Sequence, residues 1–221
     1  MKYEVPFISN TAEDKQCLQA AYGMIRNYFE PDLEMSWDEW SAITGYLPGK
    51  GTWSMAGLLW FKERGYSVIH IADFDYAALA TEGEKYLIKL HGEELAQWEI
   101  NNMDMATERT RATLFQASNI SINRKPKFSD IKAYLDKGYL VKCQVNLNAL
   151  NEIPGYTGHA VVVTGYTSSG LIIHDPGLPA RPDRYVGSER FIEAWINPET
   201  QSAKMDAIFR AAPAQLAPVI A

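Results

Sequence analysis

The sequence predicts an α+β fold with helices in its first half and antiparallel strands in its second half. Apolar residues recur at helical spacing from about residue 14 to residue 118, interrupted by one strand-like run. After residue 138 the apolar runs become short, and two of them, 159–166 and 171–174, flank a Thr-Ser-Ser-Gly turn typical of a hairpin. We therefore expect one domain over residues 1–210, with a helical half facing a sheet half.

The composition indicates a globular protein without a nucleic-acid or membrane surface. The 221 residues carry a net charge of −6, so the chain lacks the basic surplus of a nucleic-acid-binding protein. No apolar run has the length of a signal peptide or a membrane span, so we expect a cytoplasmic protein whose two cysteines stay reduced. No histidines or cysteines show zinc-site spacing, and we expect neither a metal nor an organic cofactor.

The first half is predicted to hold one extended segment, three helices and a strand before a helical insertion. Residues 3–9 are predicted to be extended, and a helix follows over 14–29. Asp14 or Thr11 could cap this helix, and a cap at Asp14 would place Cys17 at the third helical position. The capping box Ser36–Glu39 begins a short helix that ends near residue 45. The remaining predicted elements are a helix over 53–64, a strand over 66–71 and a helical insertion over about 75–123.

The second half is predicted to be mainly strands with two helices. A helix over 128–136 ends before Gly138, and a strand follows over 139–145. The hairpin comes next, then a helix over 188–195 and a strand over 205–209. The residues after 210 are rich in Ala and Pro, so we expect a disordered tail over 211–221.

Cys17 is the candidate nucleophile. Unpaired N–H groups and the helix dipole at a helix N-terminus favour a thiolate, which is the reactive form of cysteine. The alternative is a small buried apolar residue, which is what most buried cysteines are. Cys143 lies between Val141 and Val145 in a predicted strand, where the structural interpretation is favoured.

His159 is the candidate base and Asp175 the residue that orients it. Gly158 leaves His159 accessible, whereas His70 and His91 fit structural or surface roles. A two-residue turn in the hairpin would place His174 on the face of His159, and a three-residue turn with Gly170 in the left-handed conformation would align Asp175 instead. We favour the second register. Asp175 precedes Pro-Gly, so it could equally be an ordinary turn former.

An oxyanion hole needs two donors. The Cys17 backbone N–H can supply the first, and a side-chain amide can supply the second. Asn10 is the preferred amide because it lies on the segment that enters the helix, and Gln16 and Gln19 are the alternatives.

Two segments, about 25 residues around Cys17 and about 20 around the hairpin, resemble the papain-like cysteine peptidases. The resemblance is to the branch of the double-glycine leader peptidases of bacteriocin exporters, including its stand-alone members. It implies a papain-like fold with Cys17 as nucleophile, His159 as base and Asp175 as the orienting acid. The family normally has a Gln before the cysteine and a Gly after it, where this chain has Asn10 and Leu18.

The resulting hypothesis is a cysteine hydrolase that cleaves a peptide or small amide through an acyl-enzyme. Acyl transfer to an amine is a variant of this chemistry. The alternative hypothesis is a papain-like module that has lost its chemistry and binds a peptide or small molecule, which the changes at Asn10 and Leu18 favour.

Overall fold

The structure, a computed structural model, describes residues 1–197 and 201–211. Within these residues the strands form a seven-stranded sheet in the order β2-β1-β7-β3-β4-β5-β6. The strands are β1 (Ser67–Ala72), β2 (Ser121–Asn123), β3 (Leu140–Asn146), β4 (Gly158–Tyr166), β5 (Gly170–Asp175), β6 (Arg181–Gly187) and β7 (Lys204–Phe209). Residues 212–221 of the predicted tail lie outside the described residues.

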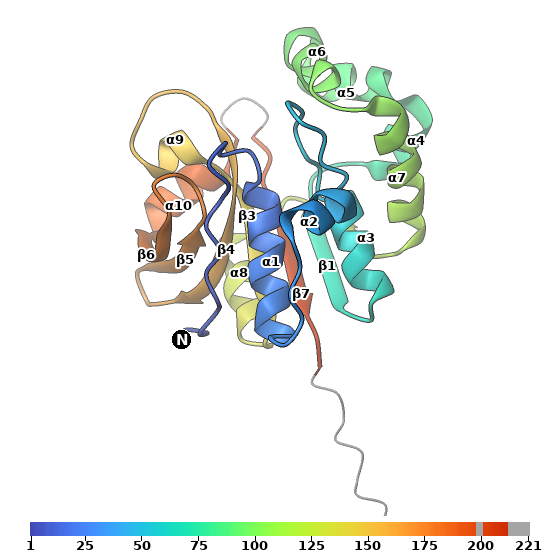
Figure 1. The fold of residues 1–221 in the computed structure, drawn as a ribbon. Helices are drawn as coiled ribbons and strands as arrows, with labels where there is room; N and C mark the ends of the chain where they lie inside the picture. Colours follow the sequence, from blue (N-terminus) through green and yellow to red (C-terminus); the bar gives the residue numbers. More distant parts are fainter. Residues whose placement is uncertain (198–200, 212–221) are drawn as a thin grey trace, which may run out of the picture.

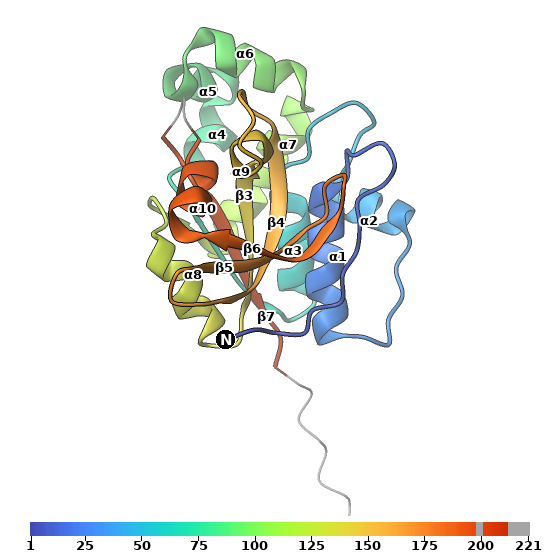
Figure 2. The same cartoon turned by 90° about the vertical axis from the view of Figure 1, so that its left-hand side faces the viewer.

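Helices cover both faces of this sheet, and the α+β class predicted from the sequence is confirmed. Helices α1 (Cys17–Phe29), α2 (Trp37–Thr44) and α3 (Met55–Glu63) pack on one face, while α8 (Phe128–Leu135) and α10 (Ser188–Trp195) pack on the other (Figures 1 and 2). Two apolar cores result, one on each side of the sheet. Among the described residues, no helix combines the length and the apolar character that crossing a membrane requires.

The predicted helical insertion is the crossover between two parallel strands. Helices α4 (Tyr76–Glu82), α5 (Glu84–His91), α6 (Glu93–Asn101) and α7 (Met105–Ala117) connect β1 to β2, which pair in parallel. Parallel neighbours need such a long connection because the chain must return to the same end of the sheet. The last residues of the predicted insertion, 121–123, are therefore a strand and not helical.

Helix α1 begins three residues later than predicted. Asp14 adopts a left-handed φ of 53°, which is incompatible with capping a helix at that position, and Gln16 becomes the N-cap. Asn10 shapes the turn before the helix, because its Oδ1 accepts hydrogen bonds from the N–H groups of Thr11 and Gln16, both at 2.9 Å. Cys17 is therefore the first helical residue and not the third, still within the first turn.

The hairpin of β4 and β5 has a different register from the predicted one. Its turn is the two-residue form, since the Thr167 N–H donates to the carbonyl of Gly170, and Gly170 is not left-handed. A bulge at Thr164 then shifts the register by one residue, so that Val162 pairs with His174. The shift leaves Asp175 on the face of His159, as predicted, although the bulge and not the turn produces it.

The N-terminal segment stabilises this bulge. The Tyr3 N–H donates to the carbonyl of Thr164 at 2.7 Å, and Lys2 forms a bridge with Gly165. A side chain at Gly165 would clash with the backbone of Met1, so glycine is needed for this close approach. The first ten residues therefore run alongside the hairpin and fix both Thr164 and the entry to α1.

Besides β2, two elements were not predicted: the short helix α9 (Leu147–Leu150) and the edge strand β6. Strand β6 contains Pro182 and is exposed over most of its length, so it shows neither the alternation nor the composition of a buried strand. The other predicted helices and strands agree with the observed boundaries to within two residues.

Candidate active site

Cys17 lies where the first turn of α1 meets the start of β4. It is half-buried and forms no disulfide. Its thiol contacts the side chain of His159 and the backbone N–H of Ala160. The backbone N–H of Cys17 belongs to the first helical turn, whose N–H groups have no acceptor within the helix. Cys17 therefore supplies both a thiol and a backbone N–H donor that is free of intrahelical bonds.

His159 and Asp175 form a buried pair beside Cys17. The His159 Nε2 lies 2.8 Å from Asp175 Oδ1, which leaves Nδ1 as the ring nitrogen available to the thiol. Asp175 Oδ1 also accepts the Gly177 N–H at 3.1 Å, and its Oδ2 accepts from the Arg184 guanidinium at 2.8 Å. The structure thus brings together the three residues that the sequence singled out.

The electrostatics of the three groups favour charge separation. Burial raises the pKa of the Cys17 thiol, but the contact with His159 outweighs it and the net shift is downward. Burial lowers the pKa of His159, and the bonds to Asp175 and Cys17 overcome this and raise it to about 10. Burial also raises the pKa of Asp175, and its bonds to His159 and Arg184 lower it overall. The lowered pKa of Cys17 and the raised pKa of His159 both shift the equilibrium towards a thiolate beside an imidazolium.

The three candidate oxyanion amides all donate hydrogen bonds within the protein. Asn10 Nδ2 donates to Asp14 at 2.6 Å, and Gln16 Nε2 donates to the Ser41 hydroxyl at 2.7 Å. Gln19 is fully buried, and its Nε2 donates to Thr44 at 2.9 Å. Full burial keeps Gln19 away from any substrate oxygen. Asn10 and Gln16 lie on the segment that precedes Cys17, and each already donates one hydrogen bond.

His174, the competing histidine, lies on the opposite face of β5 from Asp175. Its Nε2 is 2.8 Å from the carbonyl of Val5, and its Nδ1 accepts the Asp183 N–H at 3.1 Å. Both ring nitrogens are therefore used to hold the N-terminal segment and β6. Cys143 is fully buried in β3, and burial raises the pKa of its thiol well above the ordinary value. Neither residue reaches Cys17.

Arg184 is the contributor that sequence reasoning missed. It lies on β6, and besides Asp175 it donates to the carbonyl of Leu150. Its side chain is 15% exposed, so the ion pair with Asp175 is largely removed from water. The sequence around it, Arg-Pro-Asp-Arg, carries no strand signal, and a charged residue in a polar segment gave no local indication of this contact.

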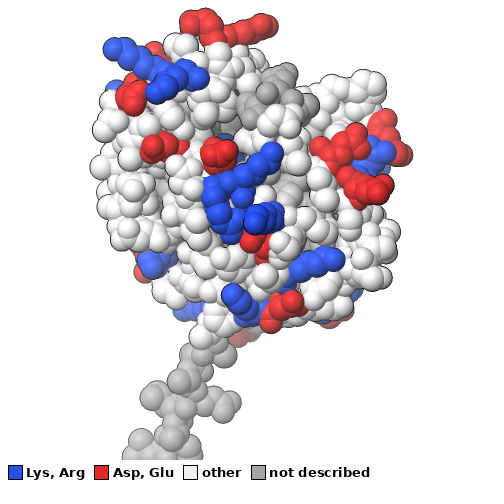
Figure 3. All heavy atoms as spheres, turned by 180° about the vertical axis from the view of Figure 1, so that it is seen from behind, with Lys and Arg blue, Asp and Glu red and all other residues white. Residues whose placement is uncertain are grey.

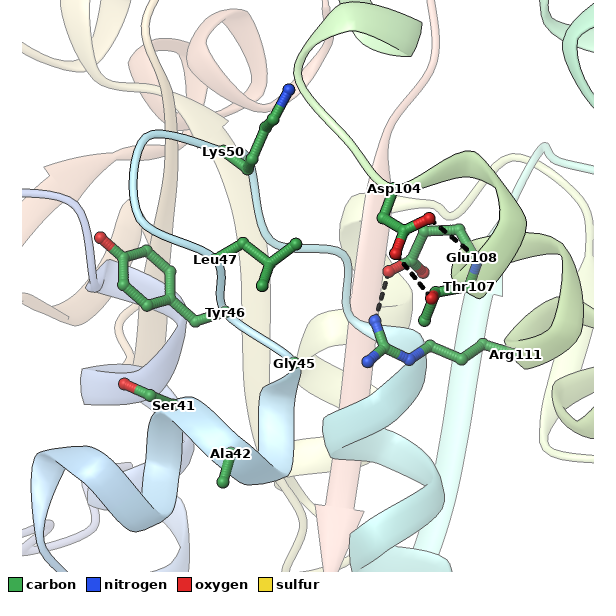
Figure 4. Close-up of a pocket in the computed structure, with 11 residues that line it drawn as sticks. Ser41, Ala42, Gly45, Tyr46, Leu47, Lys50, Asp104, Thr107, Glu108 and Arg111 are labelled. Atoms are coloured by element: carbon green, nitrogen blue, oxygen red, sulfur yellow. Dashed lines mark hydrogen bonds and ion pairs between the residues drawn. The ribbon is translucent and has the colours of Figure 1, made fainter.

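A pocket of about 230 Å³ lies between the 45–51 loop and α7 (Figure 4). Arg111 points towards Gly45 and pairs with Glu108, while Tyr46 points away from both (Figure 4). Ser41 connects this pocket to the candidate active site, because its hydroxyl accepts the hydrogen bond from Gln16, the residue before Cys17.

The face turned away from the viewer in Figure 1 shows acidic and basic side chains next to one another (Figure 3). Ion pairs of the described residues join Arg124 with Asp130, and Arg190 with Glu152 and Glu193. The pattern is that of an ordinary solvated surface.

Comparison with known proteins adds a family assignment. The model of the family described as "Peptidase_C39 like family" matches residues 72–203, more than half of the chain. The matched range contains His159 and Asp175 and begins after Cys17. No curated protein matches the chain.

The solved structures that are similar to the chain include the following three. A double glycine motif protease from an AMS/PCAT transporter, crystallised with the leader peptide, has 14% identity and a TM-score of 0.47, with 94% of each chain covered. The peptidase domain of Streptococcus ComA, a bi-functional ABC transporter involved in a quorum sensing pathway, has 16% identity and a TM-score of 0.47, covering 92% of this chain and 98% of that one. A C39-like peptidase from Bacillus anthracis has 15% identity and a TM-score of 0.45, covering 94% and 96%.

Proposed function

Because the chain belongs to the Peptidase_C39-like family, we propose that it is a cysteine hydrolase of peptide or small-amide bonds in which Cys17, His159 and Asp175 form the catalytic triad. The observation that carries the proposal is the His159 ring, bonded through Nε2 to Asp175 and adjacent to the thiol of a helix N-terminal cysteine. A nucleophile, a base and a residue that orients the base are the parts that thiol acyl chemistry needs. We also propose a cytoplasmic location, where such a thiol stays reduced.

In the proposed mechanism, the Cys17 thiolate attacks the carbonyl carbon of the scissile amide. His159, protonated at Nδ1, gives that proton to the leaving nitrogen as the C–N bond breaks, and a thioester to Cys17 remains. Neutral His159 then takes a proton from water, the hydroxide adds to the thioester carbon, and the carboxylic acid leaves as the thiolate re-forms. Asp175 holds the ring and stabilises its charged form throughout.

The Cys17 backbone N–H and Asn10 are the proposed donors to the oxyanion. The amide nitrogen of Asn10 has two N–H groups: one donates to the exposed carboxylate of Asp14, and the other is the proposed donor to the substrate oxygen, while Oδ1 is fixed by the helix entry. Removing an oxyanion donor costs about 100- to 1,000-fold in kcat, so the proposal requires a large loss of turnover in Asn10→Ala.

The test uses a library of tryptic peptides incubated with the wild-type protein, Cys17→Ala and Cys143→Ala, with new peptide termini read by mass spectrometry. We expect cleavage by the wild type and by the matched control Cys143→Ala, and none by Cys17→Ala. Circular dichroism and thermal unfolding confirm that the variants are folded. The same cleavage pattern in Cys17→Ala would overturn the proposal.

A specific observation supports a second candidate function. Each candidate side-chain amide near Cys17 already commits an N–H group to a hydrogen bond within the protein, which restricts its orientation towards a substrate oxygen. This favours either a catalytically impaired module that binds a peptide or small molecule, or acyl transfer that is completed only with the acceptor bound. Rapid thiol labelling at Cys17 without cleavage of any peptide would favour these alternatives.

A further inference from the structure

We propose that the sheet surface next to Cys17, formed by Ala160, Gln144 and Lys204, is a subsite for a substrate residue that carries a carboxylate. The inference rests on the proposed function, since it concerns the acyl group that Cys17 would attack. It identifies the substrate class as a peptide or amide with an acidic side chain or a free carboxylate close to the scissile bond.

The three residues form a row across adjacent strands that begins at the thiol. Ala160, whose N–H contacts Cys17, pairs with Gln144 on β3, and Gln144 pairs with Lys204 on β7. Directly paired residues point to the same face of a sheet, and neighbouring strands lie about 4.8 Å apart. The backbone of Lys204 is therefore roughly two strand spacings from Ala160, a distance that a substrate side chain and the lysine side chain together can span.

Gln144 offers an unused amide in this row. It is half-buried, and none of the described residues forms a hydrogen bond with its side chain. Gly158 lies on the same face of β4, and a Cβ there would be in ordinary contact with Tyr156, 3.7 Å from its hydroxyl, and 3.9 Å from Gln144 Nε2. This contrasts with Asn10, Gln16 and Gln19, whose amides are all engaged.

Lys204 supplies a cation that lacks a partner among the described residues. Its Nζ lies 5.5 Å from the ring centroid of Trp53 and 5.1 Å from that of Phe74, and no described carboxylate pairs with it. The neighbouring Lys142, by contrast, is paired with Asp206 at 2.8 Å. The two aromatic rings hold the ammonium in place and exclude water, conditions under which a carboxylate binds strongly.

Two acidic groups act on this lysine, Glu99 on α6 and Asp206 on β7, and Asp206 is already paired with Lys142. Glu99 is the one of the two without a lysine partner. It acts on Lys204 through space without forming an ion pair, and it lies 3.7 Å from His91. Burial raises the pKa of Glu99 and lowers that of Lys204, so both groups would gain from a counter-charge. A bound carboxylate would supply the counter-charge of Lys204. The negative charge of Glu99 would repel that carboxylate and weaken its binding, so the effect can be tested with Glu99→Gln.

The experiment compares two alkylating agents that differ only in charge, N-(iodoacetyl)glycine and N-(iodoacetyl)glycinamide. In both, the Cys17 thiolate displaces iodide from the same carbon, and only the first carries a carboxylate. The ratio of their rates at Cys17, measured by mass spectrometry, cancels the intrinsic reactivity of the thiol. We expect Lys204→Met to lower this ratio about three- to tenfold, the range of a partly buried ion pair. Gln144→Leu should lower it less, and Glu99→Gln should raise it.

Lys137→Met is the matched control, because Lys137 is exposed at the end of α8 and its loss removes the same charge. An unchanged ratio in Lys204→Met, or the same fall in Lys137→Met, would overturn the subsite. Slow reaction of the wild type with both agents at pH 6 would instead contradict the proposed triad. In that case the ratio of the two alkylation rates would be measured at pH 8.5, where any thiol reacts. That ratio would still show whether Lys204 binds the carboxylate.

Discussion

Two buried histidine–aspartate pairs lie in the same sheet and differ in what completes them. His159 is 2.8 Å from Asp175, and His70 on β1 is 2.6 Å from Asp206 on β7. All four residues are at most 5% exposed. Burial disfavours both imidazolium ions, yet the pKa of His159 is raised to about 10 and that of His70 is lowered.

The difference comes from the third partner. Asp206 shares its charge with Lys142 at 2.8 Å, and the hydroxyl of Tyr76 lies 2.7 Å from the second nitrogen of His70. His70 is therefore enclosed and unable to exchange a proton with a ligand. His159 instead has a thiol at its second nitrogen, and an anion there stabilises the imidazolium. The role of a buried His–Asp pair thus depends on the group at the second nitrogen of the histidine. A tyrosine hydroxyl there gives a structural pair, and a thiol gives a candidate catalytic pair.

The largest expected effect is a loss of stability when the pair of His70 and Asp206 is broken. Asp206→Ala should lower the free energy of unfolding by about 3–5 kcal/mol, because Lys142 would be left buried without a counter-charge. Urea denaturation measures this. Asp183→Asn is the control, since it removes the charge of an exposed ion pair with Lys2, keeps a residue type that tolerates the left-handed φ of 51°, and should cost less than about 1 kcal/mol. A loss below that value in Asp206→Ala would show that Lys142 is not dependent on its partner.

The next largest effect separates the two histidines by reactivity. His159→Ala should slow iodoacetamide labelling of Cys17 at pH 6 by about 100-fold, because an ordinary thiol with a pKa near 8.5 is almost wholly protonated there. His70→Ala should change the rate less than about twofold, since His70 does not contact the thiol. Peptide mass spectrometry gives both rates. Equal rates in the two variants would remove the basis for distinguishing the pairs.

The sequence predicted the residues of the candidate site better than the contacts that place them. Cys17, His159 and Asp175 could be chosen from local patterns: a helix start, a glycine before a strand and a turn after one. The bulge at Thr164 could not, because it depends on a hydrogen bond from Tyr3, which lies far away in the sequence. Tertiary contacts of this kind leave no trace in a local pattern.

Tertiary contacts also explain why the role of Arg184 and the hydrogen bonds of the side-chain amides could not be predicted from the sequence. Arg184 reaches Asp175 from an edge strand that the sequence does not signal, because proline and charged residues there read as a loop. The engagement of Asn10 with Asp14, and of Gln16 with Ser41, depends on the path of the turn and on the position of α2. Residue type and spacing indicated which side chains could donate a hydrogen bond to an oxyanion. They did not indicate whether those donors are already bonded within the protein.

A smaller effect is expected from pH, and its sign differs between the pairs. The folded pKa of His159, about 10, lies above the ordinary 6.5, so its contribution to stability is complete below pH 6.5 and is lost as the pH rises through 10. The folded pKa of His70 is lowered, so it opposes stability only as the pH falls below 6.5. Cys17 opposes this trend at first, because its lowered pKa adds stability as the pH rises towards about 8.5, the value of an ordinary thiol. Unfolding free energies should therefore fall mainly between about pH 8.5 and 10 in the wild type, and less so in His159→Gln.

That comparison needs a control for general alkaline effects. His70→Gln retains the His159 pair, so its stability should fall with pH as the wild type does over the same range. A fall of the same size in His159→Gln would contradict the assignment of the high pKa to His159.

The smallest effect concerns Arg184, the counterpart of Lys142 in the candidate catalytic pair. Arg184→Met should slow labelling of Cys17 at pH 6 by about threefold, because Asp175 keeps its bonds to His159 and to the Gly177 N–H. Arg181→Met, on the same strand, removes an exposed bond to Asn151 and should leave the rate unchanged. Partial recovery in Arg184→Lys would show that charge, and not packing, is responsible. A loss as large as that in His159→Ala would mean that Arg184 holds Asp175 in place, and that the two pairs depend on their cations equally.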